Sequence, residues 1–252
     1  EPFDGSIGAS SVLFPMGGKY QNTPEAGMAA KIPVLPPYET STVSLMSYGY
    51  DPRIAQWSPW HGAQIAVLHS LAKITAMGGN CENARLTFQE YFERMSSEES
   101  WGKPLAALLG ALSAQKAMGT ASIGGKDSMS GTFKDISVPP TLVSFAVATE
   151  DVKNVTSGSF KSTDSHIYAA IQSYSENLAP DFETFKENAR KIYKLNQEGK
   201  IKAMYPVGTG GIAEAIAKMS FGNKIGCCIN SSVQELLFVP MYGSIIIETT
   251  EE

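Results

Sequence analysis

The chain is poor in cysteine and in long apolar runs. Its three cysteines, Cys81, Cys227 and Cys228, form no CxxC or CxH pattern, and an odd, low count fits a reducing compartment. No apolar run approaches the roughly 18 residues that a membrane span needs. The acidic start EPFDGS does not resemble a signal peptide. We therefore expect a cytoplasmic protein without a membrane partner.

An excess of basic charge is also lacking. The chain has 20 Lys and Arg residues against 25 Asp and Glu residues, a formal net charge of −5. This balance disfavours nucleic-acid binding through one dominant basic face, although a small anion site built from backbone amides stays compatible with it. The hydrophobic fraction of 43% is ordinary for a globular protein, and 252 residues suffice for one large domain or two modest ones.

Several catalytic patterns are absent as well. The glycine-rich stretches do not satisfy the GxxxxGK[ST] pattern of a Walker A loop, and His61 and His69 lack the HxxxH spacing of a helical metal pair. The linear order suggests no Ser-His-Asp or Cys-His arrangement, so we assign no catalytic residue. The chain has no initiator methionine and ends just after a strand-like run, from which we expect a fragment of a longer protein.

Hydrophobic periodicity indicates two α/β units in series. In the first we expect helices at 60–78, 88–95 and 104–118, with Pro104 in a first turn and Gly119 as a C-terminal cap, and a strand at 141–149. In the second we expect strands at 166–172, 225–229 and 244–248 and helices at 181–198 and 212–220. The polar, turn-rich segment 150–165 between them is the candidate domain boundary, which gives domains at 1–150 and 151–252.

The stretch GGKDSMSGTF at 124–133 is the first candidate site, expected to be a loop. Its glycines would let backbone N–H groups converge on an anion, and Lys126 would add a charge. Asp127 could hold a metal or a substrate hydroxyl, and Ser128 could donate a hydrogen bond. A plain turn with a solvated lysine explains the same residues equally well.

The second candidate site is PVGTGG at 206–211, which precedes a predicted helix. Free amides and the helix dipole favour an anion at such a position. Close packing of the helix on a strand explains the glycines at least as well.

Several long motifs together resemble one known family. GGKDSMSGTF is followed by VPPTLVSFAVAT and preceded by WSPWHGAQIAVLHSLAKITAMGG and WGKPLAALLGALSAQKAMG, and PVGTGGIAEAIAKMSFGN stands later in the chain. In this order they resemble phosphoribosylformylglycinamidine synthase, the glutamine-dependent enzyme of purine biosynthesis. The resemblance implies an α/β (α+β) fold: the second of two halves that are each similar to aminoimidazole ribonucleotide synthetase. Such a half has a barrel-forming N-terminal domain and a C-terminal domain, here truncated.

The resemblance also implies a reaction. ATP activates the amide oxygen of formylglycinamide ribonucleotide, and ammonia from a separate glutaminase domain then displaces phosphate to give formylglycinamidine ribonucleotide. The implied cofactors are ATP or ADP and Mg²⁺. The implied partners are the first synthetase half, the glutaminase domain and the ribonucleotide substrate. Because the family's half buries a sheet edge against its partner, we expect the fragment alone to form a homodimer without activity.

Carried over residue by residue, the resemblance gives a nucleotide and phosphate site at Gly124, Gly125, Lys126, Asp127, Ser128, Gly210 and Gly211. For the metal it gives Asp4, while the family's Glu-x-x-x-Asn pair falls on His69 and Lys73 and its Asp-x-Ser on Pro206 and Gly208. Pro206 and Gly208 cannot ligate magnesium through a side chain, and Lys73 is cationic. The alternative to a catalytic part is therefore a scaffold half with a decayed nucleotide site, in which Lys73 replaces the charge of the metal. A freestanding synthetase of the aminoimidazole ribonucleotide type is disfavoured by the missing first-half signature.

Overall fold

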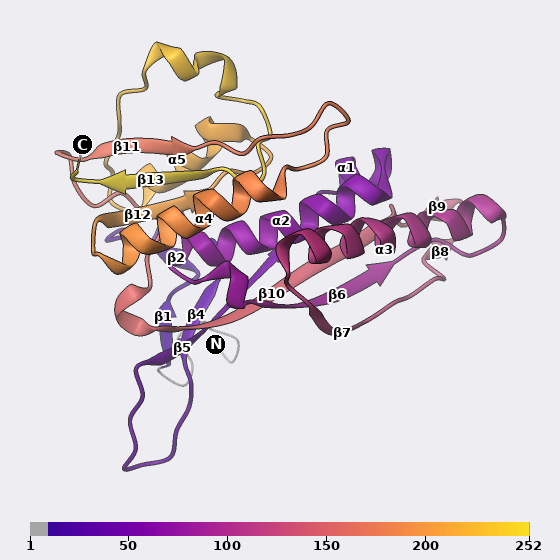
Figure 1. Ribbon diagram of the computed structural model, residues 1–252, viewed down its shortest axis with the longest axis horizontal. Coiled ribbons are helices and arrows are strands. Elements are labelled where there is room, and N and C mark those ends of the chain that lie inside the picture. The colour runs from indigo at the N-terminus through magenta and orange to yellow at the C-terminus, as the bar shows by residue number, and fades with distance from the viewer. Residues whose placement is uncertain (1–9, 252) are drawn as a thin grey trace.

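The computed structural model describes residues 10–251 and contains two main β-sheets (Figure 1). The larger sheet has six strands in the order β1 (Ser11–Leu13), β4 (Met28–Lys31), β5 (Thr42–Gly49), β10 (Thr141–Asp151), β6 (Arg85–Tyr91) and β7 (Ser122–Lys126). All neighbours in it are antiparallel except β6 and β7. The smaller sheet is antiparallel, in the order β11 (His166–Ala170), β13 (Ile245–Thr249) and β12 (Ile201–Pro206).

Helix α2 (Pro59–Ala76) lies between these two sheets. It packs against β5 and β10 on one side and against β12 on the other, and α3 (Glu98–Met118) and α4 (Phe182–Gln197) lie beside it (Figure 1). Because 14 of its 18 residues are buried, the helix has no polar face of the kind that a surface helix shows. Some of its polar groups are paired inside, as where the Ser47 hydroxyl donates to the Ser70 carbonyl at 2.7 Å.

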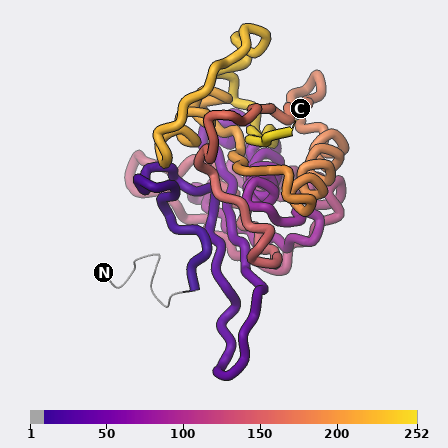
Figure 2. The backbone as a smooth tube through the Cα atoms, turned by 90° about the vertical axis from the view of Figure 1, so that its left-hand side faces the viewer, coloured from indigo at the N-terminus to yellow at the C-terminus, as the bar shows by residue number. Residues whose placement is uncertain are grey.

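The two remaining helices, α1 (Pro52–Trp57) and α5 (Gly211–Phe221), lie on the same side of the six-stranded sheet as α2–α4 (Figure 1). No described helix covers the opposite face. That face carries large apolar side chains that are more than a third exposed: Met28, Met46, Tyr48, Tyr91 and Phe145. We call these five residues the open sheet face. The connection between β4 and β5 extends well away from the body of the molecule in both views (Figures 1 and 2).

A short ribbon near the start of the chain reaches across to the second half. It pairs β2 (Met16–Gly17) with β3 (Thr23–Pro24). The Thr23 hydroxyl donates to the Lys218 carbonyl of α5 at 2.6 Å, and the Gly222 N–H donates to that hydroxyl at 2.9 Å. The Tyr205 hydroxyl of β12 donates to the Pro24 carbonyl at 2.9 Å. In Figure 2 this indigo segment lies against the orange one, so this ribbon also joins the two halves.

The largest buried apolar cluster also crosses between the halves. It combines side chains of the six-stranded sheet and α2 with Phe182, Phe185 and Ala189 of α4 and with Tyr242. The predicted division into domains 1–150 and 151–252 stays a prediction. Within the described residues no helix is both long enough and apolar enough to cross a bilayer.

Most predicted elements are confirmed. Helices 60–78, 181–198 and 212–220 correspond to α2, α4 and α5, and strands 141–149, 166–172 and 244–248 correspond to β10, β11 and β13. The predicted strand 225–229 is wrong. The edge strand β11, which would be its neighbour, pairs only with β13 among the described strands, so this segment has no partner for a ladder.

The predicted helix 88–95 is also wrong, because the first half of that stretch belongs to strand β6 and the rest is irregular. Leu86, Phe88 and Glu90 are buried on one face of the strand, and the residues between them are more exposed. Phe92 lies just after the strand and is buried as well. Alternation with a period of two therefore describes this segment better than helical spacing does.

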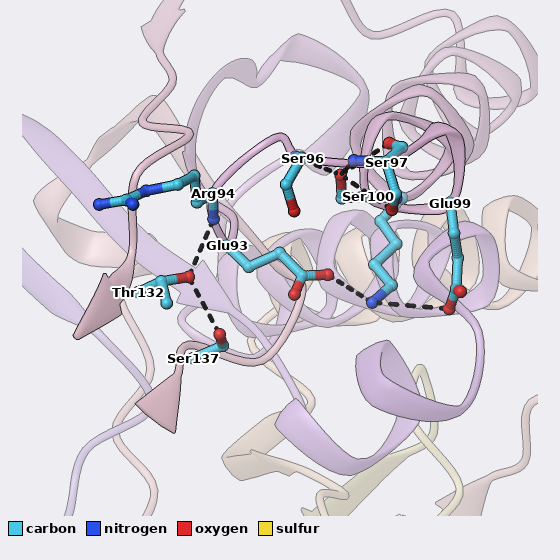
Figure 3. Close-up of polar contacts among 9 residues, drawn as sticks. Glu93, Arg94, Ser96, Ser97, Glu99, Ser100, Thr132 and Ser137 are labelled. Atoms are coloured by element: carbon cyan, nitrogen blue, oxygen red, sulfur yellow. Dashed lines mark hydrogen bonds and ion pairs between the residues drawn. The ribbon is translucent and has the colours of Figure 1, made fainter. Parts of the chain in front are cut away.

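Helix α3 begins six residues earlier than predicted, at Glu98. Ser97 caps it: its hydroxyl accepts from the Ser100 N–H at 3.2 Å, and its own N–H donates to the Ser100 hydroxyl at 3.0 Å. Just before the helix, Glu93 accepts a 2.5 Å hydrogen bond from Lys103 (Figure 3). This cap starts the helix although Pro104 then lies inside it rather than in its first turn. Gly119 ends the helix with φ at 70°, as predicted.

The buried Glu90 side chain makes the stability of the fold depend on pH. Its side chain lies on the helix-covered face of β6 and is only 4% exposed. Burial, followed by the nearby charge of Asp127, raises its pKa from 4.5 to about 7. The folded state therefore holds a proton that the unfolded state releases between these two values, so the stability falls as the pH rises through this window.

We predict that Glu90→Gln is more stable than the parent chain above about pH 7, by about 1–3 kcal/mol. The difference should disappear near pH 5, where the parent carboxyl is protonated in the folded state. Urea denaturation at both pH values measures it. The exposed Glu235→Gln variant is the control and should show no such pH dependence. Equal stabilities of the Glu90→Gln variant and the parent chain at pH 8 would contradict the prediction.

Candidate functional site

A cavity of about 310 Å³ lies where the six-stranded sheet, α2, β12 and α5 come together. The end of β5 supplies Tyr48, and α2 supplies His69 and Lys73 one turn apart on its last two turns. Helix α5 supplies Glu214 and Lys218, likewise one turn apart. The spacing of four residues places each pair on one face of its helix, so two helices from distant parts of the chain present polar groups to one space.

The four positions that the resemblance assigns to magnesium ligands all line this cavity: His69, Lys73, Pro206 and Gly208. The structure thus brings together residues that are separated by more than 130 positions in the sequence. None of the four carries a carboxylate, which is the side chain that Mg²⁺ prefers. No group of three or more His, Cys, Asp or Glu side chains within residues 10–251 is arranged to hold a metal ion. These residues do not fit magnesium. Asp4, the other expected metal ligand, lies outside the described residues.

Lys73 brings a positive charge into the cavity. Its ammonium nitrogen lies 4.1 Å from the centre of the Tyr48 ring, which is a favourable cation–π distance. Burial, and then the charge of Lys218, lowers the pKa of Lys73 to about 8, so the side chain is still mostly charged at neutral pH. Among the described residues no carboxylate forms an ion pair with it.

His69 faces the same space in its neutral form. It is 8% exposed, and its ring meets the Tyr242 ring edge-on with 4.9 Å between the centres. Burial, followed by the charges of Lys73 and Lys218, holds the pKa of His69 well below its usual range. Its Nδ1 atom is buried without a hydrogen-bond partner, which is uncommon for a buried polar atom.

Two carboxylates line the cavity in different states. Glu25 accepts from the Gly158 N–H at 2.8 Å through Oε2, while its Oε1 is buried without a partner. Burial raises the pKa of Glu25. Glu214 is fully engaged, because it accepts from the Gly210 N–H at 2.6 Å and from Lys218 at 2.5 Å.

A third carboxylate, Asp51, does not line the cavity but binds two residues that do. It accepts from the Tyr242 hydroxyl at 2.6 Å, from the Thr209 hydroxyl at 3.0 Å and from the Arg53 guanidinium at 3.3 Å. Burial raises the pKa of Asp51, but these hydrogen bonds outweigh burial and lower it to about 2. The network fixes Thr209 and Tyr242, two residues that line the cavity. No local sequence pattern indicates this network, because Asp51 and Tyr242 are 191 positions apart.

The predicted glycine site at 206–211 borders the cavity, but the N–H groups of Gly210 and Gly211 already have partners within the chain. Gly210 caps the start of α5, and its N–H is held by Glu214. Gly211 follows with φ at 70°, and a Cβ there would lie 2.5 Å from the Leu237 carbonyl oxygen. Close packing therefore accounts for Gly211. A nucleotide role of Gly210 and Gly211 stays a prediction.

The predicted loop 124–133 is partly wrong, because Gly124, Gly125 and Lys126 belong to the edge strand β7. A Cβ at Gly125 would lie 2.4 Å from the Phe88 carbonyl oxygen, so glycine there allows the close approach of β6. The ammonium of Lys126 lies 3.7 Å from the centre of the Tyr91 ring.

None of the five predicted ligands from Gly124 to Ser128 lines the cavity, and Asp127 and Ser128 follow β7 as irregular chain. The two glycine-rich stretches therefore do not meet in one site. Phosphate binding by residues 124–128 stays a prediction.

Comparison with known proteins finds PurL subunits among the relatives of this chain. No protein-family model matches the chain. The PurL subunit of phosphoribosylformylglycinamidine synthase from Pyrococcus furiosus is 24% identical over 223 residues, which are 80% of this chain and 31% of that protein. The PurL subunit from Pyrobaculum aerophilum is 27% identical over 248 residues, which are 91% of this chain and 33% of that protein. The chain thus spans about a third of the length of these relatives.

Solved structures agree in fold. T. maritima PurL complexed with ATP superposes with a TM-score of 0.69 over 96% of this chain and 36% of that one, at 18% identity. T. maritima PurL complexed with FGAR superposes with a TM-score of 0.69 over 93% of this chain and 41% of that one, at 11% identity. The expected α/β fold of a synthetase half is therefore confirmed. The chain is thus similar in sequence and in fold to PurL, the phosphoribosylformylglycinamidine synthase subunit.

Proposed function

We propose that this chain is part of the ATP-dependent synthetase region of a phosphoribosylformylglycinamidine synthase. That region converts formylglycinamide ribonucleotide, ATP and ammonia derived from glutamine to formylglycinamidine ribonucleotide, ADP and phosphate. The observation that carries the proposal is the match to PurL proteins over at least four-fifths of the chain, in sequence and in fold. The PurL structures complexed with ATP and with FGAR support these substrates.

Within that region, we assign this chain a supporting rather than a catalytic part. The cavity at α2 and α5 holds the ammonium group of Lys73 where the resemblance expects a metal ligand, with Lys218 nearby, and a magnesium ion would be repelled there. We therefore assign no step of the reaction to a magnesium ion at this cavity. Phosphoryl transfer to the amide oxygen, and displacement of that phosphate by ammonia, take place in the partner half, and this chain acts as a non-catalytic scaffold.

The open sheet face is the surface through which the scaffold would act. Its apolar side chains lie on adjacent strands: Met28 is opposite Met46 across β4 and β5, and Tyr48 is opposite Phe145 across β5 and β10. Large contiguous apolar surfaces of this kind mark protein–protein contacts. We propose that the first synthetase half packs on this face, and that two copies of the chain pair through it and the adjoining strand edge when that half is absent. The glutaminase domain would then be linked to this chain only indirectly, through the other parts of the assembled enzyme.

Reconstitution tests the proposed activity. The chain is mixed with the rest of the PurL-type protein from its own source, and amidine formation from formylglycinamide ribonucleotide, ATP and ammonia is measured. We expect no turnover from the chain alone and restored turnover from the mixture. Lys126→Ala separates the two roles, because a scaffold tolerates this change and a phosphate-binding contributor loses turnover. Absence of turnover in a mixture that forms a stable complex would contradict the proposal.

The docking surface is tested by charge insertion. Phe145→Lys places an ammonium in the middle of the open sheet face, and burying it in a contact costs several kcal/mol. We expect this variant to lose assembly with the first half while its circular dichroism is unchanged. Phe133→Lys is the matched control, because Phe133 is exposed on the separate β8 (Thr132–Phe133) ribbon. Sedimentation velocity measures both assembly and self-association, and equal assembly of the two variants would contradict the assignment of this face.

A further inference from the structure

Helix α3 carries large apolar side chains on its exposed side. Its buried residues are mostly small, such as Ala107, Ala111 and Ala114, and the helix packs against α2. Five large apolar side chains on the other side are each 46–58% exposed, and we call them the α3 stripe: Trp101, Leu105, Leu108, Leu109 and Leu112. A surface helix normally carries polar residues on that side. An exposed apolar surface of this kind indicates a contact with another protein.

The two ends of the α3 stripe carry charges of opposite sign. Glu98 precedes the stripe and Lys116 follows it, and both side chains are exposed. Because 18 positions separate them, which is about five helical turns, they lie on the same side of the helix. Neither forms an ion pair with any residue of the described range 10–251. The stripe is therefore apolar in the middle, acidic at one end and basic at the other.

These charges are complementary between two copies of α3 that run antiparallel. If Leu105 of one copy lies opposite Leu109 of the other, Glu98 lies opposite Lys116 at both ends of the pair. The apolar side chains then meet in the centre, and each charge gains a partner of opposite sign. In a parallel pair, Glu98 would face Glu98 and Lys116 would face Lys116. The pattern therefore favours an antiparallel helix with the same pattern, which a second copy of this chain supplies.

Gly102 supports the same register. A Cβ at this exposed position would meet no heavy atom of the surrounding structure within 4 Å, so the packing of the single chain does not require a glycine there. Glycine inside a helix is also less favourable than alanine. In the antiparallel register Gly102 lies opposite Leu112, and Ser113 lies opposite Trp101. Each large side chain thus meets a small residue, and the close approach of a second helix accounts for the glycine.

We propose that two copies of this chain pair through α3 in antiparallel orientation, with the α3 stripe at the centre of the contact. The helix lies on the covered side of the six-stranded sheet, and the open sheet face lies on the other side (Figure 1). The two contacts therefore do not compete. The inference goes beyond the proposed function, because the pairing requires neither activity nor a first synthetase half. With both surfaces free, the isolated chain forms assemblies larger than a dimer.

Sedimentation velocity of the Phe145→Lys chain isolates the α3 contact, because a lysine in the open sheet face blocks pairing there. We expect a monomer–dimer equilibrium between about 1 and 100 μM, since one helix face is a small interface. Adding Leu109→Lys places two ammonium groups in the centre of the contact and should weaken dimerisation by at least about a hundredfold. Leu195→Lys is the matched control, because Leu195 is an exposed leucine of α4. It should leave dimerisation unchanged.

Exchange of the end charges tests the orientation. In the same Phe145→Lys chain, Glu98→Lys or Lys116→Glu alone places like charges opposite each other and should weaken the dimer about threefold or more. The double exchange restores opposite charges at both ends and should recover the dimer to within about twofold. Because the double exchange opposes the helix dipole, a change in the stability of α3 cannot imitate the recovery.

Three results would overturn the proposal: a Phe145→Lys chain that stays monomeric at about 100 μM, equal effects of Leu109→Lys and Leu195→Lys, or no recovery in the double exchange. Each of these concerns α3 alone, whereas a wrong assignment of the open sheet face would show as unchanged assembly in Phe145→Lys.

Mixing with the rest of the PurL-type protein tests a different occupant of α3. We expect the parent chain to form a complex with two copies of each component, and Leu109→Lys to divide that complex into halves with one copy of each. If Leu109→Lys instead prevents binding of the rest of the protein, that protein covers α3 and the proposal is wrong.

Discussion

Burial of helix α2 on nearly all sides is the constraint on which the rest of the structure depends. The helix fills the space between the six-stranded and the three-stranded sheet, and α3 and α4 close its flanks. A helix in this position must be apolar on nearly all sides, because a polar side chain buried between two sheets without a hydrogen-bond partner would destabilise the fold. Only near its C-terminal end, at the cavity, does it carry His69 and Lys73. The position of the site is thus set by where the helix emerges from between the sheets.

The sequence predicted those elements whose local pattern agrees with their tertiary surroundings. Helix α2 is long and uniformly apolar, α4 is strongly amphipathic, and β10 is a compact apolar run, so each follows from its own residues. Strand β6 was misread as a helix because the aromatic residues around it satisfy both periodicities over a few positions. The start of α3 was misplaced because Ser97 and Ser100 outweigh Pro104, a balance that depends on two specific hydrogen bonds.

The candidate site could be predicted only in part. The resemblance singled out His69, Lys73, Pro206 and Gly208, and the structure shows that all four share one cavity. It could not foretell that Glu214 occupies the Gly210 amide or that Asp51, Thr209 and Tyr242 form a network behind the cavity. The contacts of Asp51 join residues of different halves, and the pairing of Glu214 with the Gly210 amide depends on side-chain direction as well as on spacing. The stretch from Gly124 to Ser128 illustrates the converse: residues typical of a phosphate loop serve in part as an edge strand.

The ribbon formed by β2 and β3 also bears on how the molecule folds. Thr23 bonds to Lys218 and to Gly222, which lie 195 and 199 positions further along the chain. Contacts of such sequence separation form slowly, because the chain entropy of closing so long a loop must be offset before they contribute. On a ribosome, residues 16–24 would emerge long before Lys218 and Gly222 and could find these partners only after the intervening chain had been made. The cavity, whose walls include both segments, would therefore be among the last parts of the molecule to be completed.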